Sequence, residues 1–86
     1  MATFFLSRDA GGWRHFADGK PIYCGTFLEA YVGGEWVLGR YEAIDLHRGE
    51  RGAKGYLVLT GNAQLDLAEG MEVRFPKKES LGDTSL

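Results

Sequence analysis

Hydrophobic and polar residues alternate along most of this chain, in short runs that are separated by turn signals. The clearest example spans residues 27–42, FLEAYVGGEWVLGRYE, in which two alternating stretches flank the pair Gly33–Gly34. Alternation with a period of two is typical of β-strands, and a Gly-Gly pair favours a two-residue hairpin turn. The pattern therefore predicts an antiparallel hairpin at the centre of the chain.

Only one register of this hairpin keeps its charged side chains in solvent. The opposite register would bury Arg40 and Glu42, at a large desolvation cost. In the favoured register the inward residues are apolar or glycine: Leu28, Ala30, Val32, Val37, Gly39 and Tyr41. Gly39 is expected where the strand coils sharply or where another backbone comes close.

Shorter segments of the same kind flank the central hairpin. Strands are expected at residues 3–8, 13–17, 20–23, 56–60 and 71–75, and residues 64–67 form a brief strand or one helical turn. Gly11–Gly12 and Asp18–Gly19 supply turns between the first strands. Residues 45–55 are polar and lack periodicity, which predicts a loop. Residues 77–86 follow Pro76 without any pattern, which predicts a flexible tail.

The expected fold is all-β, with a single domain over residues 1–76. Eighty-six residues leave no room for a second core, and thirteen glycines are about twice the usual share of roughly 7 %. Such an excess favours many tight turns and short strands. Five to seven strands with free edges are best accommodated by a small antiparallel barrel, or by two orthogonal sheets, with the N-terminal β-hairpin in front.

One part of the chain resembles a known class of domains. LEAYVGGEWVLGRYEA, followed by GYLVL and LDLAEGMEVRF, is similar to SH3-like and Tudor-like barrels. The preceding WRHFADGKPIYCGTFLEA resembles the start of a family of short, uncharacterised bacterial proteins, so the likeness covers residues 13–75. It implies an SH3-like barrel that binds a peptide, a methylated side chain, a nucleic acid or another subunit. The chain departs from peptide-binding SH3 domains, which have a Trp-Trp pair, because Val37 follows Trp36.

Composition and motifs argue against catalysis and against a bound cofactor. Cys24 is the only cysteine, so neither a disulfide within the chain nor a Cys-rich zinc site can form. Cys24 stands in no nucleophile motif, and His15 and His47 lack metal-ligand spacing. Residues 49–55 do not end in the Lys-Ser/Thr of a phosphate-binding loop. We therefore expect a protein that is not an enzyme and that holds no metal or cofactor.

The hydropathy of the chain predicts a cytoplasmic protein that does not enter a membrane. The N-terminus lacks the basic start and long apolar stretch of a signal peptide, and no apolar run approaches the roughly 18 residues that span a bilayer. The net charge of −2 gives no overall attraction to a polyanion.

The outward side of the central hairpin is the first candidate binding site. Alternation points Phe27, Tyr31 and Trp36 away from the core, together with Arg40, and these residue types are favoured at protein interfaces. The expected partner is a protein or peptide, including a second copy of the chain. The nearby residues Glu29, Glu35 and Glu42 would suit a basic or proline-containing peptide. In the alternative arrangement, the N-terminal hairpin folds over these aromatic residues and forms a second small core.

The second candidate site is the polar segment near residue 50. Arg48, Arg51 and Lys54, beside His47, carry three positive charges against Glu50 in a glycine-rich context. Together with Trp36 they would form a weak nucleic-acid site, in which the cations contact phosphates and the ring stacks on a base. The carboxylates of the central hairpin oppose this alternative because they repel phosphate.

Overall fold

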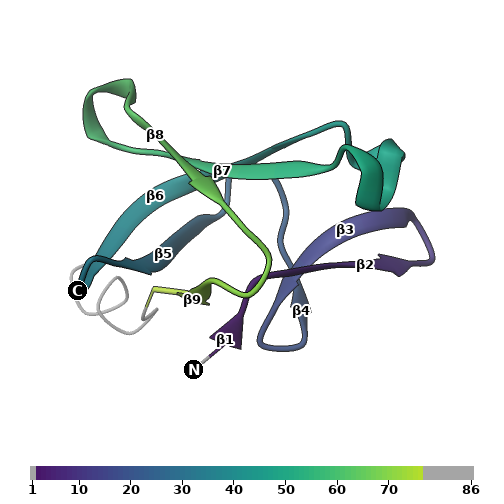
Figure 1. Ribbon diagram of the computed structural model, residues 1–86, viewed down its shortest axis with the longest axis horizontal. Helices are drawn as coiled ribbons and strands as arrows, with labels where there is room; N and C mark the ends of the chain where they lie inside the picture. Colours follow the sequence, from purple (N-terminus) through teal and green to yellow (C-terminus); the bar gives the residue numbers. More distant parts are fainter. Residues whose placement is uncertain (1, 77–86) are drawn as a thin grey trace, which may run out of the picture.

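The computed structural model describes residues 2–76, which form nine β-strands and two short 3-10 segments (Figure 1). The elements are β1 (Ala2–Thr3), β2 (Phe5–Asp9), β3 (Gly12–Ala17), β4 (Lys20–Pro21), β5 (Phe27–Val32), β6 (Glu35–Ile44), η1 (Leu46–Arg51), β7 (Lys54–Val58), η2 (Thr60–Asn62), β8 (Gln64–Leu67) and β9 (Glu72–Arg74). The all-β class is thus confirmed. The predicted tail, residues 77–86, lies outside the described residues.

The strands form two antiparallel sheets, and these sheets do not close into a barrel. The larger sheet has the order β1-β9-β5-β6-β7-β8, and the smaller sheet has the order β2-β3-β4. The prediction of a closed barrel with five to seven strands is therefore wrong. The reason lies at Phe4, which interrupts the expected strand 3–8, so that β1 joins the larger sheet and β2 the smaller one.

Two predicted hairpin turns are confirmed by their backbone geometry. Gly33 and Gly34 have φ values of +59° and +85°, and Asp18 and Gly19 have values of +54° and +69°. Positive φ at both central residues is the two-residue turn that matches the twist of the flanking strands. The first turn fixes the register of β5 against β6, in which Leu28 pairs with Gly39 and Ala30 with Val37.

The predicted inward face of the central hairpin is confirmed along most of its length. Leu28, Ala30 and Tyr41 have no exposed surface, whereas Val32, next to the turn, is 37 % exposed. Gly39 lies where another strand comes close, as its position predicted. A Cβ atom there would lie 2.7 Å from the Cβ of Leu57 in β7, so any side chain would collide with the neighbouring strand.

A buried polar pair joins the two sheets. His15 of β3 is only 3 % exposed, and its Nδ1 lies 2.6 Å from the hydroxyl oxygen of Tyr41 in β6. The ring of Phe4 stacks on the imidazole with 4.4 Å between the ring centroids. Gly55 provides the space for this cluster, because a Cβ atom there would lie 2.8 Å from Cζ of Phe4. The inner side of the N-terminal hairpin therefore covers the main core.

Burial of His15 makes the stability of the fold depend on pH. Desolvation lowers the pKa of His15 below its usual value, and the negative charge of Glu69 opposes this shift. The unfolded chain then binds more protons than the folded one, so the stabilising contribution is complete above the unfolded pKa of about 6.5 and is lost as the pH falls through the folded-state pKa.

We therefore expect the free energy of unfolding, measured with urea, to decrease as the pH is lowered from about 7.5 to about 5. A His15→Phe variant is expected to be less stable, because Tyr41 loses its partner, but to show a flatter pH profile. His47→Gln, at an exposed position, serves as the control and keeps the wild-type slope. Equal slopes in all three proteins would contradict the assignment to His15.

The segment expected as a loop, residues 45–55, contains regular structure. It begins at Asp45 in the left-handed region, with φ +54°, continues through η1, and enters β7 at Lys54. Gly49 is buried in the middle of η1 because the ring of Trp13 packs against its backbone. Residues 64–67, which were expected to form a brief strand or one helical turn, form strand β8. Within residues 2–76, no helix is long and apolar enough to cross a membrane.

Candidate functional site

The outer side of β5, β6 and β9 carries a group of aromatic, aliphatic and charged side chains. Because successive residues of a strand point to opposite sides, burial of Leu28 and Ala30 sends their neighbours outward. The register places Phe27 opposite Arg40 and Tyr31 opposite Trp36. All four residues predicted for partner binding thus share one side of the hairpin. We call this surface the aromatic face; it consists of Phe27, Glu29, Tyr31, Trp36, Leu38, Arg40, Glu42 and Arg74.

Trp36 is held in place by contacts with two neighbouring side chains. The ring of Tyr31 lies 5.1 Å from the ring of Trp36, centroid to centroid, at an angle of 56°. The guanidinium carbon of Arg74 lies 3.9 Å from the centroid of the Trp36 ring, and Nε of Arg74 donates a 2.7 Å hydrogen bond to Oε1 of Glu29. These contacts restrict the indole before any partner binds, which reduces the entropy lost on association.

Arg74 belongs to this arrangement but was missed at the sequence level. The alternation of MEVRF is sufficient to point Arg74 away from the core, because Val73 is buried. The alternation does not reveal that β9 lies beside β5. That pairing joins Arg74 to Glu29, 45 positions away in the sequence, and it became visible only in the fold.

The aromatic face is open to solvent. Phe27 is 57 % exposed, Leu38 51 % and Tyr31 44 %. The N-terminal hairpin lies on the opposite side of the larger sheet, where His15 contacts Tyr41. The alternative arrangement, in which this hairpin covers the aromatic residues, is therefore wrong. Exposed apolar side chains gathered on one surface are uncommon on isolated domains and mark sites of interaction.

Paired charges surround the exposed apolar residues. Arg74 binds Glu29, and Nε of Arg40 lies 2.9 Å from Oε2 of Glu42. Two of the three carboxylates that were expected to attract a basic peptide thus already have an arginine beside them on the same surface. The four charges sum to zero, so a partner with a strong charge of either sign gains little there.

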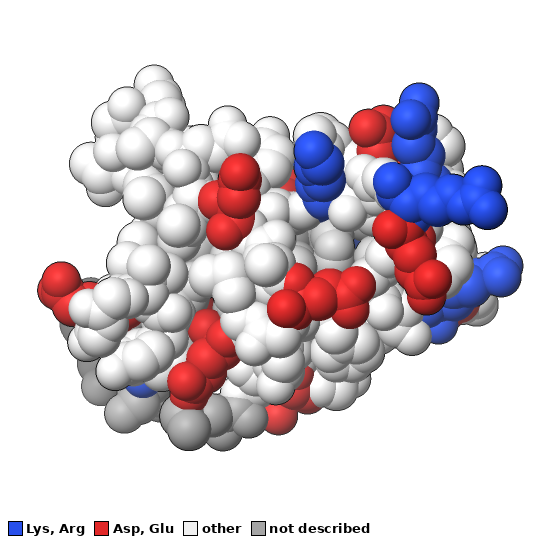
Figure 2. Space-filling model, viewed as in Figure 1, with Lys and Arg blue, Asp and Glu red and all other residues white. Residues whose placement is uncertain are grey.

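The basic segment lies in a different part of the molecule. Arg48 and Arg51 are exposed on η1, and Figure 2 shows Lys and Arg side chains gathered at the end of the molecule where η1 lies. The backbone between them is fixed, since Gly49 has φ +59° and a Cβ atom there would lie 2.6 Å from Cε2 of Trp13. The cations therefore project from an anchored segment of backbone.

The structure does not bring Trp36 to the basic segment. Trp36 lies near the start of β6, whereas Lys54 pairs with Ile44 at its end. The eight residues from Trp36 to Ile44 span about 27 Å at roughly 3.4 Å per residue. A site that combines Arg48, Arg51 and Lys54 with Trp36 is thus not assembled, although the three cations themselves lie on one connected segment.

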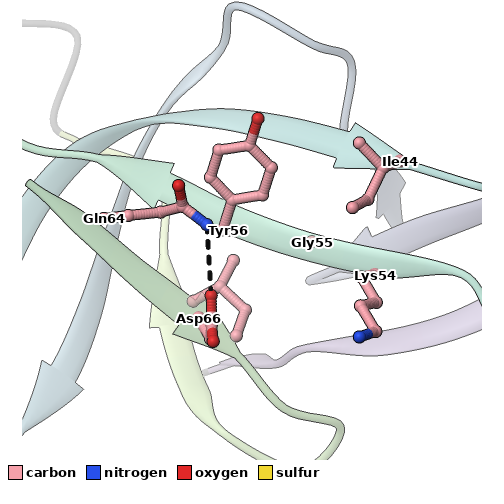
Figure 3. A pocket seen from close by; sticks show the side chains of 7 residues that line it. Ile44, Lys54, Gly55, Tyr56, Gln64 and Asp66 are labelled. Atoms are coloured by element: carbon pink, nitrogen blue, oxygen red, sulfur yellow. Dashed lines mark hydrogen bonds between the residues drawn. The ribbon is translucent and has the colours of Figure 1, made fainter. Parts of the chain in front are cut away.

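A hollow of about 410 Å³ lies over β6, β7 and β8 (Figure 3). Its lining combines apolar, charged and amide side chains: Ile44, Lys54, Gly55, Tyr56, Gln64, Asp66 and Leu67. In Figure 3, Gln64 and Lys54 lie toward opposite ends of the hollow, with Tyr56 between them. Sequence reasoning singled out Lys54 for the basic segment but not Tyr56, because the neighbours of β7 on the sheet were not known.

The residues considered for catalysis are used differently. His15 is paired with Tyr41 in the core, and Cys24 is an exposed thiol. Burial lowers the pKa of His15 and raises the pKa of Tyr41. Both shifts favour the neutral forms in which the two groups share a hydrogen bond. Among residues 2–76, no three His, Cys, Asp or Glu side chains come together in a way that could hold a metal ion.

Comparison with known protein families identifies the family of this chain. The model of a family described as a domain of unknown function, DUF5348, matches residues 4–75, which is nearly the whole of the described chain. No curated protein and no solved structure matches the chain.

Proposed function

We propose that this chain, which belongs to the DUF5348 family of domains of unknown function, is a small protein-binding module that docks its partner on the aromatic face. The observation that carries the proposal is Trp36, which contacts the tilted ring of Tyr31 and the guanidinium of Arg74 on the same face as the exposed side chains of Phe27 and Leu38. Trp, Tyr and Arg are the residues that contribute most to binding energy when they lie at the centre of an interface.

The chemistry of the aromatic face also suggests the kind of partner. Burying the exposed parts of Phe27, Leu38 and Tyr31 removes apolar surface from water, which stabilises a complex in rough proportion to the area covered. The surrounding ion pairs are neutral as a set. We therefore propose a partner surface or peptide that is mainly apolar and weakly charged, and a complex that is insensitive to salt.

The resemblance of residues 13–75 to SH3-like and Tudor-like domains supports this proposal, because such small β domains act by binding. With it we propose a non-catalytic role in a bacterial cytoplasm. A second copy of the chain is one partner that fits, since a face with balanced charges does not repel a copy of itself.

Site-specific photocrosslinking in the producing cells tests the proposal. Benzoylphenylalanine in place of Leu38 is expected to yield crosslinked products, whereas the same probe in place of Tyr23, which is 55 % exposed on another part of the molecule, is not. Adding Trp36→Ala to the Leu38 probe is expected to reduce the product at least tenfold, because removing a residue of this kind from an interface usually costs about 2 kcal/mol or more.

The products also separate the kinds of partner. A product of twice the chain's mass, formed with purified protein, would identify a second copy, and a different mass would identify another protein. Equal products from the two probe positions, or products that persist in Trp36→Ala, would overturn the proposal. Circular dichroism confirms that each variant keeps its fold.

A further inference from the structure

We infer that the hollow over β6, β7 and β8 is a nucleotide site, with guanine as the preferred base. The hollow adjoins the aromatic face, because Tyr56 of β7 pairs with Glu42 of β6, but the inference does not rest on the function proposed for that face. The hollow has a volume of about 410 Å³, within the range of roughly 300–1,000 Å³ that is usual for small-molecule sites. A mononucleotide fits a space of this size.

One wall of the hollow offers a flat apolar surface. Tyr56 of β7 and Ile44 of β6 both line it, and the ring of Tyr56 is only partly buried. An aromatic ring that remains accessible on a strand provides a stacking surface for any base, and each such stack is usually worth about 1–3 kcal/mol. Tyr56 would therefore hold the base, without choosing among bases.

The edge of the base would be recognised by Gln64 and Asp66 of β8. Nε2 of Gln64 donates to Oδ1 of Asp66 over 3.5 Å, which is a long bond. This hydrogen bond uses one of about four acceptor positions of the Asp66 carboxylate and one of the two amide hydrogens of Gln64. Guanine presents two adjacent donors, N1–H and N2–H, and beside them the acceptor O6. Asp66 can accept from both donors while the amide of Gln64 donates to O6, and adenine lacks this order of groups.

The phosphate would lie toward Lys54. Lys54 and Tyr56 are two residues apart on the same side of β7, which is about 7 Å at roughly 3.4 Å per residue. This spacing is comparable to the separation between base and 5′-phosphate in a nucleotide. Arg48 and Arg51 lie on η1, which precedes Lys54 in the chain, at the end of the molecule where Figure 2 shows the cations. The packing of Trp13 against Gly49 anchors the backbone between these two arginines.

The same chemistry is present in a free nucleotide and in a single-stranded nucleic acid. A free nucleotide would occupy the hollow alone, whereas a strand would place one guanine there and add phosphate contacts along η1. Contacts of the second kind weaken as salt is added, because each phosphate that is neutralised releases counterions.

Titrations followed by amide-resolved NMR test this inference. We expect GMP to shift the amide signals of residues 54–56 and 64–66, and AMP to bind about tenfold more weakly. Inorganic phosphate is the probe for simple anion binding and should shift only the signals of η1 and Lys54. A short single-stranded DNA that contains one guanine distinguishes the two sources. If the DNA causes salt-sensitive shifts at a lower concentration than GMP does, the site is assigned to nucleic acid. If the DNA binds no more tightly than GMP, the site is assigned to the free nucleotide.

Three variants assign the roles of the residues. Tyr56→Ala is expected to weaken GMP at least about fivefold through loss of stacking, and Asp66→Asn to abolish the preference for GMP over AMP. Tyr23→Ala, an exposed tyrosine outside the hollow, leaves binding unchanged. The inference is overturned if millimolar GMP and the guanine-containing DNA shift no amide signals, or if phosphate alone reproduces their effect. It is also overturned if the Tyr56→Ala variant gives the spectrum of a folded protein and binds GMP as tightly as the wild type does.

Discussion

Replacing Phe4 by Ala is expected to lower the free energy of unfolding by about 3–5 kcal/mol, the usual loss for a large aromatic residue in a core. Phe4 is 1 % exposed and packs on His15 and Tyr41, with ring centroids 4.4 and 6.3 Å apart. Its backbone also joins the chain ends of the domain, since its N–H donates to the carbonyl of Met71 and its carbonyl accepts from Gly70. Because a small domain is commonly stable by only roughly 5–15 kcal/mol, this one change removes much of the total.

The adjacent residue provides a matched control. Phe5 has the same side chain, but it is 38 % exposed on the outer side of the smaller sheet, where it stacks on Phe16. Phe5→Ala should lower the free energy of unfolding by about 1 kcal/mol, a typical value for a point mutation. Urea denaturation of the two variants measures the difference. Similar losses at both positions would show that Phe4 does not join the two sheets as described.

Gly39→Ala is expected to destabilise the fold by about 1–3 kcal/mol, the usual range for adding volume to a packed core. The backbone of Gly39 does not need glycine's positive φ, so the loss arises from space alone. The added methyl would lie 2.7 Å from Cβ of Leu57 and 3.1 Å from the carbonyl oxygen of Val58. Because both neighbours belong to the main body of β7, relief requires the two strands to separate.

Gly11→Ala is the control for the general effect of removing a glycine. Gly11 lies in the turn between β2 and β3, and a Cβ atom there would make only an ordinary 3.4 Å contact with Oδ1 of Asp9. Its change in unfolding free energy should remain within about 0.5 kcal/mol. A loss at Gly39 no larger than the loss at Gly11, measured by urea denaturation, would contradict the close approach of β6 and β7.

The central hairpin could be predicted from sequence because its determinants are local. The Gly33–Gly34 turn sets the register, and the charges of Arg40 and Glu42 exclude the other one, so the outward direction of Phe27 and Trp36 follows from nearby residues. The same reasoning located Gly39 at a close contact. It is for this reason that the four residues predicted for the aromatic face share one side of the sheet.

Features that depend on distant pairing could not be predicted in this way. The break at Phe4 separates β1, which pairs with β9, from β2, which pairs with β3, and no local pattern indicates it. The stacking of Arg74 on Trp36 requires β9 to lie beside β5. Similarly, the polarity of residues 45–55 predicted exposure of the cations correctly, but the burial of Gly49 depends on Trp13, which lies far away in the sequence.

Strand β9 lies between β1 and β5, so the earliest strand of the described chain is fixed by the latest. During synthesis, β1 has no partner, and β5 has one free edge, until Glu72–Arg74 have left the ribosome. A fragment that ends before Glu72 would lose the buried side chain of Val73 and would leave the edge of β5 at Glu29 and Ala30 without its partner strand. Such an edge is a template for pairing with another chain. Interrupted synthesis or C-terminal proteolysis of this domain therefore yields fragments prone to aggregate, and the complete domain can form only after its last strand is released.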